Sequence, residues 1–164
     1  MNAIAIVYTS NTGFTARYAA MLSERLGIPA HPLTEALKSL PAGTPVIHMG
    51  WLMAGSVVGY KKAAQCFAIT AVIGVGLGDT GAQDDAARKA CKLPEEVPVF
   101  TVQGGMELAQ LRGPYKIAIK LLTKAMAAKK NRTPDEDKML TLLQKGGDYV
   151  SEKELAAVLT WAES

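Results

Sequence analysis

Four hydroxyl side chains lie close together near the start of the chain. Thr9, Ser10, Thr12 and Thr15 surround Gly13 in a short loop that contains no lysine or arginine. Hydroxyls and free backbone amides are neutral donors that suit an anion, and glycine lets the backbone come close to a ligand. The first amides of a helix have no partner within it, and the helix dipole is positive at that end. The loop therefore predicts a phosphate site built from neutral donors.

Two elements must position this loop. The apolar run Ala3–Tyr8 predicts a buried strand before it, and apolar residues at helical spacing predict a helix over Thr15–Leu26 after it. A plain helix cap is the alternative interpretation, because hydroxyl-rich turns are common where strands lead into helices.

A second candidate loop, Gly50–Gly59, follows a predicted strand over Pro45–Met49. Gly50 frees the backbone there, and Trp51, Leu52 and Met53 are large apolar residues. A tryptophan in a loop suits stacking on a flat ring, whereas the alternative is that its side chain joins the core.

A third candidate loop, Gly76-Leu77-Gly78-Asp79, follows a predicted buried strand over Ile69–Val75. With Gly81 it also spells the spacing of a dinucleotide fingerprint. That interpretation is disfavoured, because the loop is not in the first strand–helix unit and no acid follows at the end of the next strand. A simple glycine turn is the other alternative.

Short strands and helices alternate along the chain, which predicts an α/β fold: a three-layer, doubly wound, five-stranded parallel sheet. Ligands of such sheets bind at the carboxyl ends of the strands. Residues 131–164 predict a C-terminal helical extension of the same domain, because Thr133-Pro134-Asp135-Glu136 and Ser151-Glu152-Lys153-Glu154 are helix starts. The remaining predicted elements are a strand near Pro29–Leu33, helices Tyr60–Phe67, Gln83–Lys92 and Tyr115–Lys130, and a strand Val97–Gln103.

Composition narrows the classes of function. The 164 residues are 49% hydrophobic and 20% charged, with a net charge of +3, as in an ordinary single globular domain. No run is apolar enough to cross a bilayer and no leader pattern is visible, so a cytoplasmic location is expected. Cys66 and Cys91 form no metal-spaced cluster, and no catalytic group is predicted; His48, in an apolar strand, is interpreted as structural. Receiver domains and P-loop nucleotidases are excluded, because their acidic and Gly-Lys-Ser/Thr motifs are absent.

Lysines recur every four residues on the predicted helix Tyr115–Lys130. Lys116, Lys120 and Lys124 lie in a stretch, 112–132, without an acidic residue. The pattern is compatible with contact to an acidic redox partner or an anionic membrane surface, but a solvated helix face is favoured. Nucleic acid is not expected, since no recognition motif accompanies the charge.

The first loop resembles the phosphate-binding signature of flavodoxins. Each specified position of that signature is matched by the sequence Tyr8-x-Ser10-x-x-Gly13-x-Thr15-x-x-x-Ala19. The resemblance implies a flavodoxin-like fold and FMN as the cofactor. It implies flavin contacts from all three loops: Thr9, Ser10, Asn11, Thr12, Gly13, Phe14 and Thr15; Gly50, Trp51, Leu52 and Met53; and Gly76, Leu77, Gly78 and Asp79.

The rest of the chain is similar to a bacterial flavodoxin-domain subfamily related to menaquinone-dependent protoporphyrinogen oxidase. The similarity rests on the glycines and lysines of Gly50–Lys62 and on Gly104-Gly105 after the last strand. Where flavodoxins carry an aromatic residue over the outer flavin face, this chain has Gly81 and Ala82. The expected function is electron transfer through bound FMN, passed to a redox partner. The alternatives are a flavin-dependent oxidoreductase acting on a quinone, a porphyrinogen or a similar flat substrate, and a flavin-free interaction domain.

Overall fold

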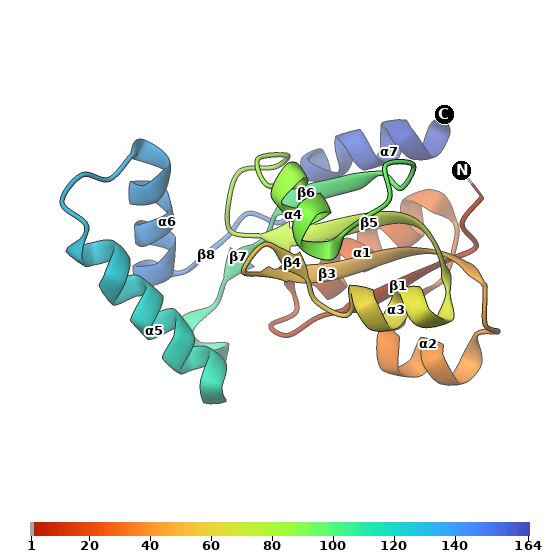
Figure 1. Cartoon of the computed structure of the whole chain (residues 1–164), viewed down its shortest axis with the longest axis horizontal. Coiled ribbons are helices and arrows are strands. Elements are labelled where there is room, and N and C mark those ends of the chain that lie inside the picture. The colour runs from red at the N-terminus through yellow and green to blue at the C-terminus, as the bar shows by residue number, and fades with distance from the viewer. Residues whose placement is uncertain (1) are drawn as a thin grey trace.

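The structure, a computed structural model, describes residues 2–164 and has an α/β architecture (Figure 1). The strands are β1 (Ala5–Thr9), β2 (Ala30–Pro32), β3 (Pro45–Met53), β4 (Ser56–Val57), β5 (Ala68–Gly76), β6 (Val99–Gln103), β7 (Gly105–Met106) and β8 (Gly147–Asp148). The helices are α1 (Phe14–Leu26), α2 (Leu33–Ser39), α3 (Tyr60–Cys66), α4 (Asp84–Cys91), α5 (Gly113–Ala128), α6 (Pro134–Lys145) and α7 (Ala156–Glu163), with short 3-10 turns η1 (Leu108–Gln110) and η2 (Glu152–Leu155).

The central sheet has the strand order β2-β1-β3-β5-β6, and these five strands are parallel. Its middle strands are apolar on both faces because helices cover both. Ile6, Ile47 and Ile73 are fully buried on one face, and Val7, Val46 and Val72 on the other. The parallel pairing brings the carboxyl ends of β1, β3, β5 and β6 to one edge, where the loops that follow them meet.

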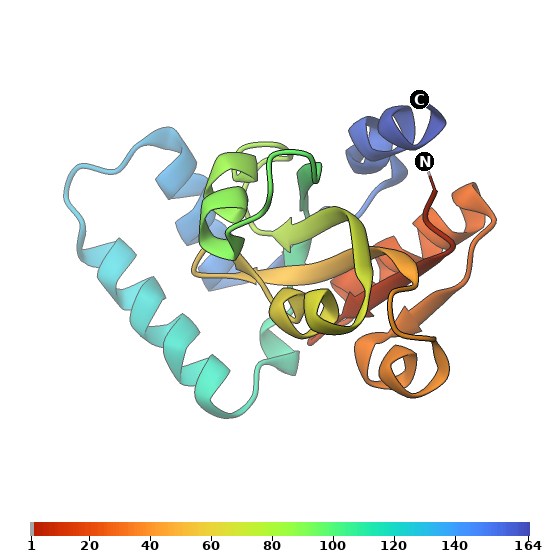
Figure 2. The same cartoon turned by 45° about the vertical axis from the view of Figure 1, so that its right-hand side comes forward.

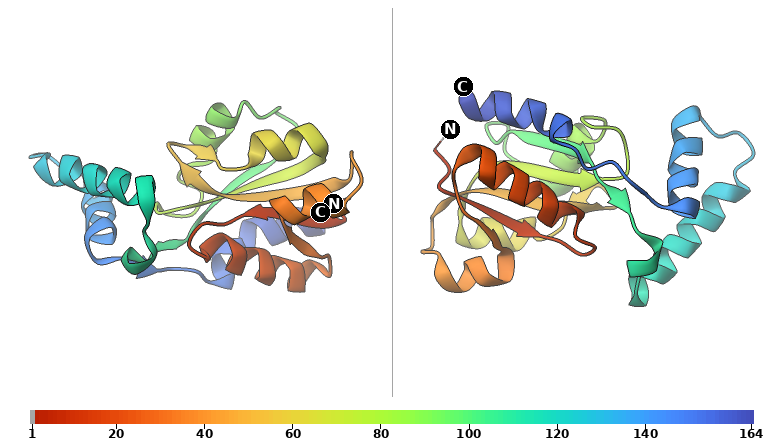
Figure 3. Two further views of the ribbon diagram at one scale, coloured as in Figure 1. Left: turned by 90° about the horizontal axis from the view of Figure 1, so that it is seen from below. Right: turned by 180° about the vertical axis from the view of Figure 1, so that it is seen from behind.

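Different helices cover the two faces of the sheet (Figures 1 and 3). Tyr18 and Leu22 of α1 pack with Val158 of α7 in one core cluster. On the other face, Ala36 of α2 and Ala63 of α3 share a second cluster, and α4 contributes Ala87 to a third. The helices α1 and α7 thus come together although they lie near opposite ends of the chain.

The helices α5 and α6 lie beyond the carboxyl-end edge of the sheet (Figures 1 and 2). We call α5 and α6 the helix pair, and residues 2–106 with 147–164 the body. A short antiparallel ribbon joins them, in which Gly105 of β7 pairs with Asp148 and Met106 with Gly147 of β8. A small cluster that includes Met106, Ile119 and Leu142 holds the helix pair against the body.

The prediction of a loop over Gly50–Gly59 is wrong. The strand β3 continues to Met53 because Trp51 still pairs with Val75 of β5, and Leu52 then pairs antiparallel with Val57 of β4. A tight turn connects these strands, with Ala54 and Gly55 at positive φ. The residues expected in a flexible loop are therefore held in register by the sheet.

Of the two helix starts predicted in the C-terminal part of the chain, only the first has the expected capping box. The capping box predicted at Thr133 is present: its hydroxyl accepts from the amide of Glu136, and the Glu136 carboxylate accepts from the amide of Thr133. The box predicted at Ser151 is wrong, because the Glu154 carboxylate accepts a hydrogen bond from the hydroxyl of Thr80 instead. The helix α2 was not predicted from the sequence.

No helix within residues 2–164 combines the length and apolar character that crossing a bilayer requires.

Candidate functional site

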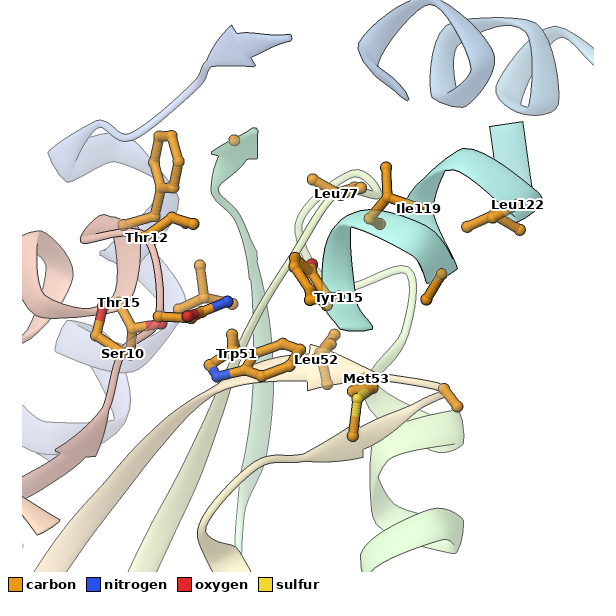
Figure 4. A pocket seen from close by; sticks show the side chains of 17 residues that line it. Ser10, Thr12, Thr15, Trp51, Leu52, Met53, Leu77, Tyr115, Ile119 and Leu122 are labelled. Atoms are coloured by element: carbon orange, nitrogen blue, oxygen red, sulfur yellow. The ribbon is translucent and has the colours of Figure 1, made fainter. Parts of the chain in front are cut away.

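A pocket of about 240 Å³ lies at the carboxyl ends of β1, β3 and β5 (Figure 4). The loop before α1, the end of β3 and the helix α5 form its walls. No charged side chain lines it. The lining residues are Ser10, Asn11, Thr12, Phe14, Thr15, Trp51, Leu52, Met53, Ala54, Val75, Gly76, Leu77, Gly105, Tyr115, Ala118, Ile119 and Leu122.

One end of this pocket is rich in hydrogen-bond donors. Gly13, at φ 95°, turns the chain into α1. The hydroxyl of Ser10 caps the turn, accepting from the amides of Gly13 at 3.2 Å and Ala16 at 3.3 Å. Within residues 2–164, the neighbouring amides of the loop and first helical turn have no hydrogen-bond partner: those of Asn11, Thr12, Phe14 and Thr15. These amides, with the hydroxyls beside them, form a donor cluster at the positive end of a helix dipole.

The middle of the pocket is aromatic. Trp51 of β3 and Tyr115 of α5 meet edge to face, with ring centroids 5.1 Å apart and ring planes at 70°. Burial raises the pKa of Tyr115 above its ordinary value of 10, so the phenol is neutral and a hydrogen-bond donor at pH 7. Tyr115 was not predicted as a site residue. The helical spacing of Tyr115, Ile119 and Leu122 predicts that they share one side of a helix, but no local pattern indicates that this side turns towards the pocket.

The other end of the pocket is apolar and open. Met53 and Leu122 lie at the end away from Ser10 and Thr15, and their side chains are 53% and 46% exposed (Figure 4). The pocket thus runs from neutral donors, past two aromatic rings, to an apolar mouth. This arrangement suits a ligand with an anionic group at one end and a flat apolar body.

The structure brings ten of the fifteen predicted site residues to this pocket. They are Ser10, Asn11, Thr12, Phe14, Thr15, Trp51, Leu52, Met53, Gly76 and Leu77. All three predicted loops contribute, which follows from the parallel strand order that places their carboxyl ends side by side.

The other five predicted residues do not line the pocket. Gly13 shapes the first loop from its far side. Gly50 is buried against Val57 and Val58, and an added Cβ would lie 2.2 Å from the carbonyl oxygen of Val58. Gly78 and Asp79 instead face α6. There Lys138 lies 3.7 Å from the Asp79 carboxylate, so this carboxylate is directed to an ion pair with the helix pair.

Thr9, the fifth residue, points away from the pocket. Its buried hydroxyl has no hydrogen-bond partner within the described chain and faces Gly59, at whose position a Cβ would lie 2.3 Å away. The imidazole of His48 lies against the same glycine. Its Nε2 lies 3.2 Å from the carbonyl oxygen of Val58, and burial lowers the pKa of His48 to about 4. His48 is therefore a neutral, buried side chain.

Within residues 2–164, no cluster of three or more histidine, cysteine or acidic side chains is arranged to hold a metal ion. No protein-family model, curated protein or solved structure gives a significant match to the chain. The site is thus defined by its own geometry: free amides and hydroxyls, an aromatic pair and an apolar mouth.

Proposed function

We propose that the protein binds FMN in this pocket and transfers electrons through the bound flavin. One observation carries the proposal: a single pocket joins the unpaired amides before α1 to the aromatic pair Trp51 and Tyr115. A flavin mononucleotide has the matching parts, a phosphate at one end and a flat ring system at the other.

The end of the pocket that is rich in hydrogen-bond donors suits a phosphate, in both the type and the number of its donors. The unpaired amides of the first loop need hydrogen-bond acceptors, and Thr12 and Thr15 add hydroxyls that line the same wall. No charged side chain lines this pocket, and Arg17, in the first turns of α1, is paired with Asp148 at 2.6 Å. Neutral donors and the helix dipole would therefore hold the phosphate charge.

The aromatic part of the pocket can take up a flavin ring if Tyr115 moves away from Trp51. A centroid separation of 5.1 Å leaves no room for a third ring between Trp51 and Tyr115, since each stacked contact needs about 3.5 Å. Tyr115 lies on α5, of which only Ile119 is buried. Trp51 is held by the sheet, so we expect Tyr115 to be the side that moves and Trp51 to be the fixed stacking surface.

When bound, the flavin would supply one- and two-electron transfer, and the protein would supply its orientation and surroundings. With no charge lining the pocket, the ring would lie in an apolar, neutral environment. Leu52, Met53 and Leu77 would flank it, and Gly76 of the third loop lines the same pocket.

The fold supports the same proposal at a coarser level. A mostly parallel sheet with helices on both faces is compatible with a flavodoxin-like, doubly wound domain. We propose that residues 131–164 extend that domain: α6 joins α5 in the helix pair, and α7 packs on the sheet beside α1. A cytoplasmic location and a redox partner protein are part of this proposal.

The test is direct binding of FMN. Purified, desalted protein is titrated into FMN while the flavin fluorescence is followed. The titration is done with the wild type and with the Thr12→Ala variant. We expect wild-type protein to bind one FMN, and the variant to bind on the order of 10- to 100-fold more weakly, because it loses a hydrogen bond to a charged group. Thr160→Ala, on the exposed face of α7, is the matched control. Equal affinity of the two variants would contradict the phosphate assignment, and no binding by wild type would favour a flavin-free interaction domain.

A second candidate is a flavin-dependent oxidoreductase acting on a flat substrate such as a quinone or a porphyrinogen. A second cavity of about 520 Å³ lies beside the first pocket. It is lined by Gln103 and Lys138 and shares Leu77 with the first pocket, which favours this candidate because a substrate could bind next to the flavin. The reduced, FMN-loaded protein is mixed with a soluble quinone, and the rate of flavin reoxidation is followed. A rate that saturates with quinone concentration indicates a substrate site, whereas a strictly linear dependence favours the electron carrier.

A further inference from the structure

The outer face of α5 exposes large aliphatic side chains. Ile117 is 62% exposed and Leu121 is 64% exposed, and Leu122 is 46% exposed beside them. The small residues Ala118 and Ala125 extend the same helix face. Within residues 2–164, six large hydrophobic side chains are exposed, and four of them lie here: Ile117, Leu121, Leu122 and, on the opposite rim of the pocket, Met53. Single exposed hydrophobic residues are common on protein surfaces, but a contiguous group of them indicates an interaction surface. We call Ile117, Ala118, Leu121, Leu122 and Ala125 the apolar face.

A row of positive charge borders this apolar face. Lys116, Lys120 and Lys124 are exposed and follow one another at each turn of α5. Within residues 2–164, no acidic side chain lies within ion-pair distance of any of the three. The acidic residues of α6 are directed elsewhere: Glu136 pairs with Lys129, and Asp137 with Arg132. The charge of the three lysines is therefore available to an external anion.

We propose that the apolar face and lysine row of α5 dock the protein on an anionic lipid bilayer. Aliphatic side chains would enter the boundary between headgroups and acyl chains, and the lysines would contact lipid phosphates. The helix would lie along the membrane plane. The proposal stands on the surface of α5 alone and does not require bound flavin.

The composition of the surface distinguishes a bilayer from a protein partner. Protein interfaces are enriched in tyrosine, tryptophan and arginine and depleted in lysine, and their binding energy rests on aromatic and arginine anchors. The apolar face has only isoleucine, leucine and alanine, and the charges that border it along α5 are the three lysines, with Arg112 before the first turn. That combination is typical of helices that lie in the interface of anionic membranes.

A second copy of the chain is a poorer occupant. In a two-fold symmetric pairing of antiparallel α5 helices, the same flank of each helix meets its own copy. The three lysines would then face three lysines, and residues 112–132 contain no acid to offset them. Like charges across such a contact are repulsive, whereas lipid phosphates neutralise them.

Docking in this orientation would also place the mouth of the pocket against the bilayer. Ala118 and Leu122 belong to both the apolar face and the pocket wall, and Met53 lies on the opposite rim. A lipid-soluble molecule could then reach the pocket without passing through water.

The experiment is co-sedimentation of the full-length protein with two kinds of vesicle. One is pure phosphatidylcholine, and the other is an equal mixture of phosphatidylcholine and phosphatidylglycerol. We expect binding to the mixed vesicles, weakened by high salt, and little binding to the neutral ones. Binding to neither kind, or equal binding to both, would overturn the proposal.

Two variants separate the apolar and charged contributions. Ile117→Gln with Leu121→Gln removes exposed apolar side chains from a helix surface, so the fold is retained. We expect it to lower the partition coefficient on the order of tenfold or more. Lys116→Gln, Lys120→Gln and Lys124→Gln together should lower it by about fivefold per lysine, or roughly 100-fold in total.

A matched control tests whether position or net charge decides binding. Lys38→Gln, Lys89→Gln and Lys153→Gln remove the same charge from exposed positions outside α5. We expect this variant to bind mixed vesicles nearly as well as wild type. Equal loss in the two triple variants would mean that binding is nonspecific attraction of a basic protein, and would overturn the assignment to α5. Dimerisation in sedimentation velocity that disappears with the Ile117→Gln and Leu121→Gln variant would assign the apolar face to self-association instead.

Discussion

The body and the helix pair are stabilised in different ways. In the body, β1, β3 and β5 carry fully buried residues on both faces of the sheet. In the helix pair, α5 buries only Ile119, while Ile117 and Leu121 remain more than 60% exposed. The body therefore holds its shape by internal packing, and the helix pair adds a surface to it. Because the pocket lies between the two, one wall is rigid and the other is weakly held.

The sharpest test of this difference is a cavity in the body. Ile73→Ala, at a fully buried position of β5, should lower the free energy of unfolding by roughly 2–5 kcal/mol. Ile117→Ala on the helix pair should change it by less than about 0.5 kcal/mol, because that side chain is exposed. Urea unfolding followed by circular dichroism measures both. Similar losses would mean that the helix pair is part of the cooperative core.

Acid should act on the body through His48. Burial lowers the pKa of His48 from 6.5 to about 4. Between these pH values the unfolded chain binds more protons than the folded one, so stability falls as the pH drops from 6.5 towards 4. The full loss is roughly 3 kcal/mol. Urea unfolding over this pH range measures the slope, and His48→Met should remove most of it; an unchanged slope in that variant would point to another group.

Substitution of Gly50, next to the β3 wall of the pocket, should lower the stability of the body. Gly50→Ala places a Cβ 2.2 Å from the carbonyl oxygen of Val58, and backbone must move to accommodate it. We expect a loss of roughly 1–3 kcal/mol and a shifted Trp51 fluorescence spectrum, since Trp51 follows in the same strand. Gly78→Ala is the matched control, because its Cβ would meet only the flexible side chain of Gln83, at 3.4 Å. Equal effects would contradict this difference.

The smallest effect is expected at the start of α6. Thr133→Ala removes the capping box of the helix pair and should cost about 1 kcal/mol locally. Hydrogen exchange should accelerate in α6 and leave the amides of β3 and β5 unchanged. Exchange that rises uniformly across the protein would show that body and helix pair open together.

Sequence patterns predicted most strands and helices of the body, although not α2 or β4, because buried parallel strands and amphipathic helices have strong local signals. They failed where tertiary pairing decides. Trp51 and Leu52 follow a glycine and read as loop, yet β5 and β4 hold them in a strand. The contribution of Tyr115 depends on how α5 is placed against the sheet, which no local pattern encodes. Asp79 was expected at the pocket, but the position of Lys138 on α6 directs it elsewhere.

The β7–β8 ribbon brings the two ends of the helix pair together. The polypeptide leaves the body through Gly105 and Met106 and returns through Gly147 and Asp148, which are hydrogen-bonded neighbours. The residues between them therefore form a segment whose two ends lie side by side. A short turn in its place would close the chain with little rearrangement of the sheet, and would remove one wall of the pocket together with the lysine row. The α5 wall of the pocket and the exposed face of α5 would then be lost together.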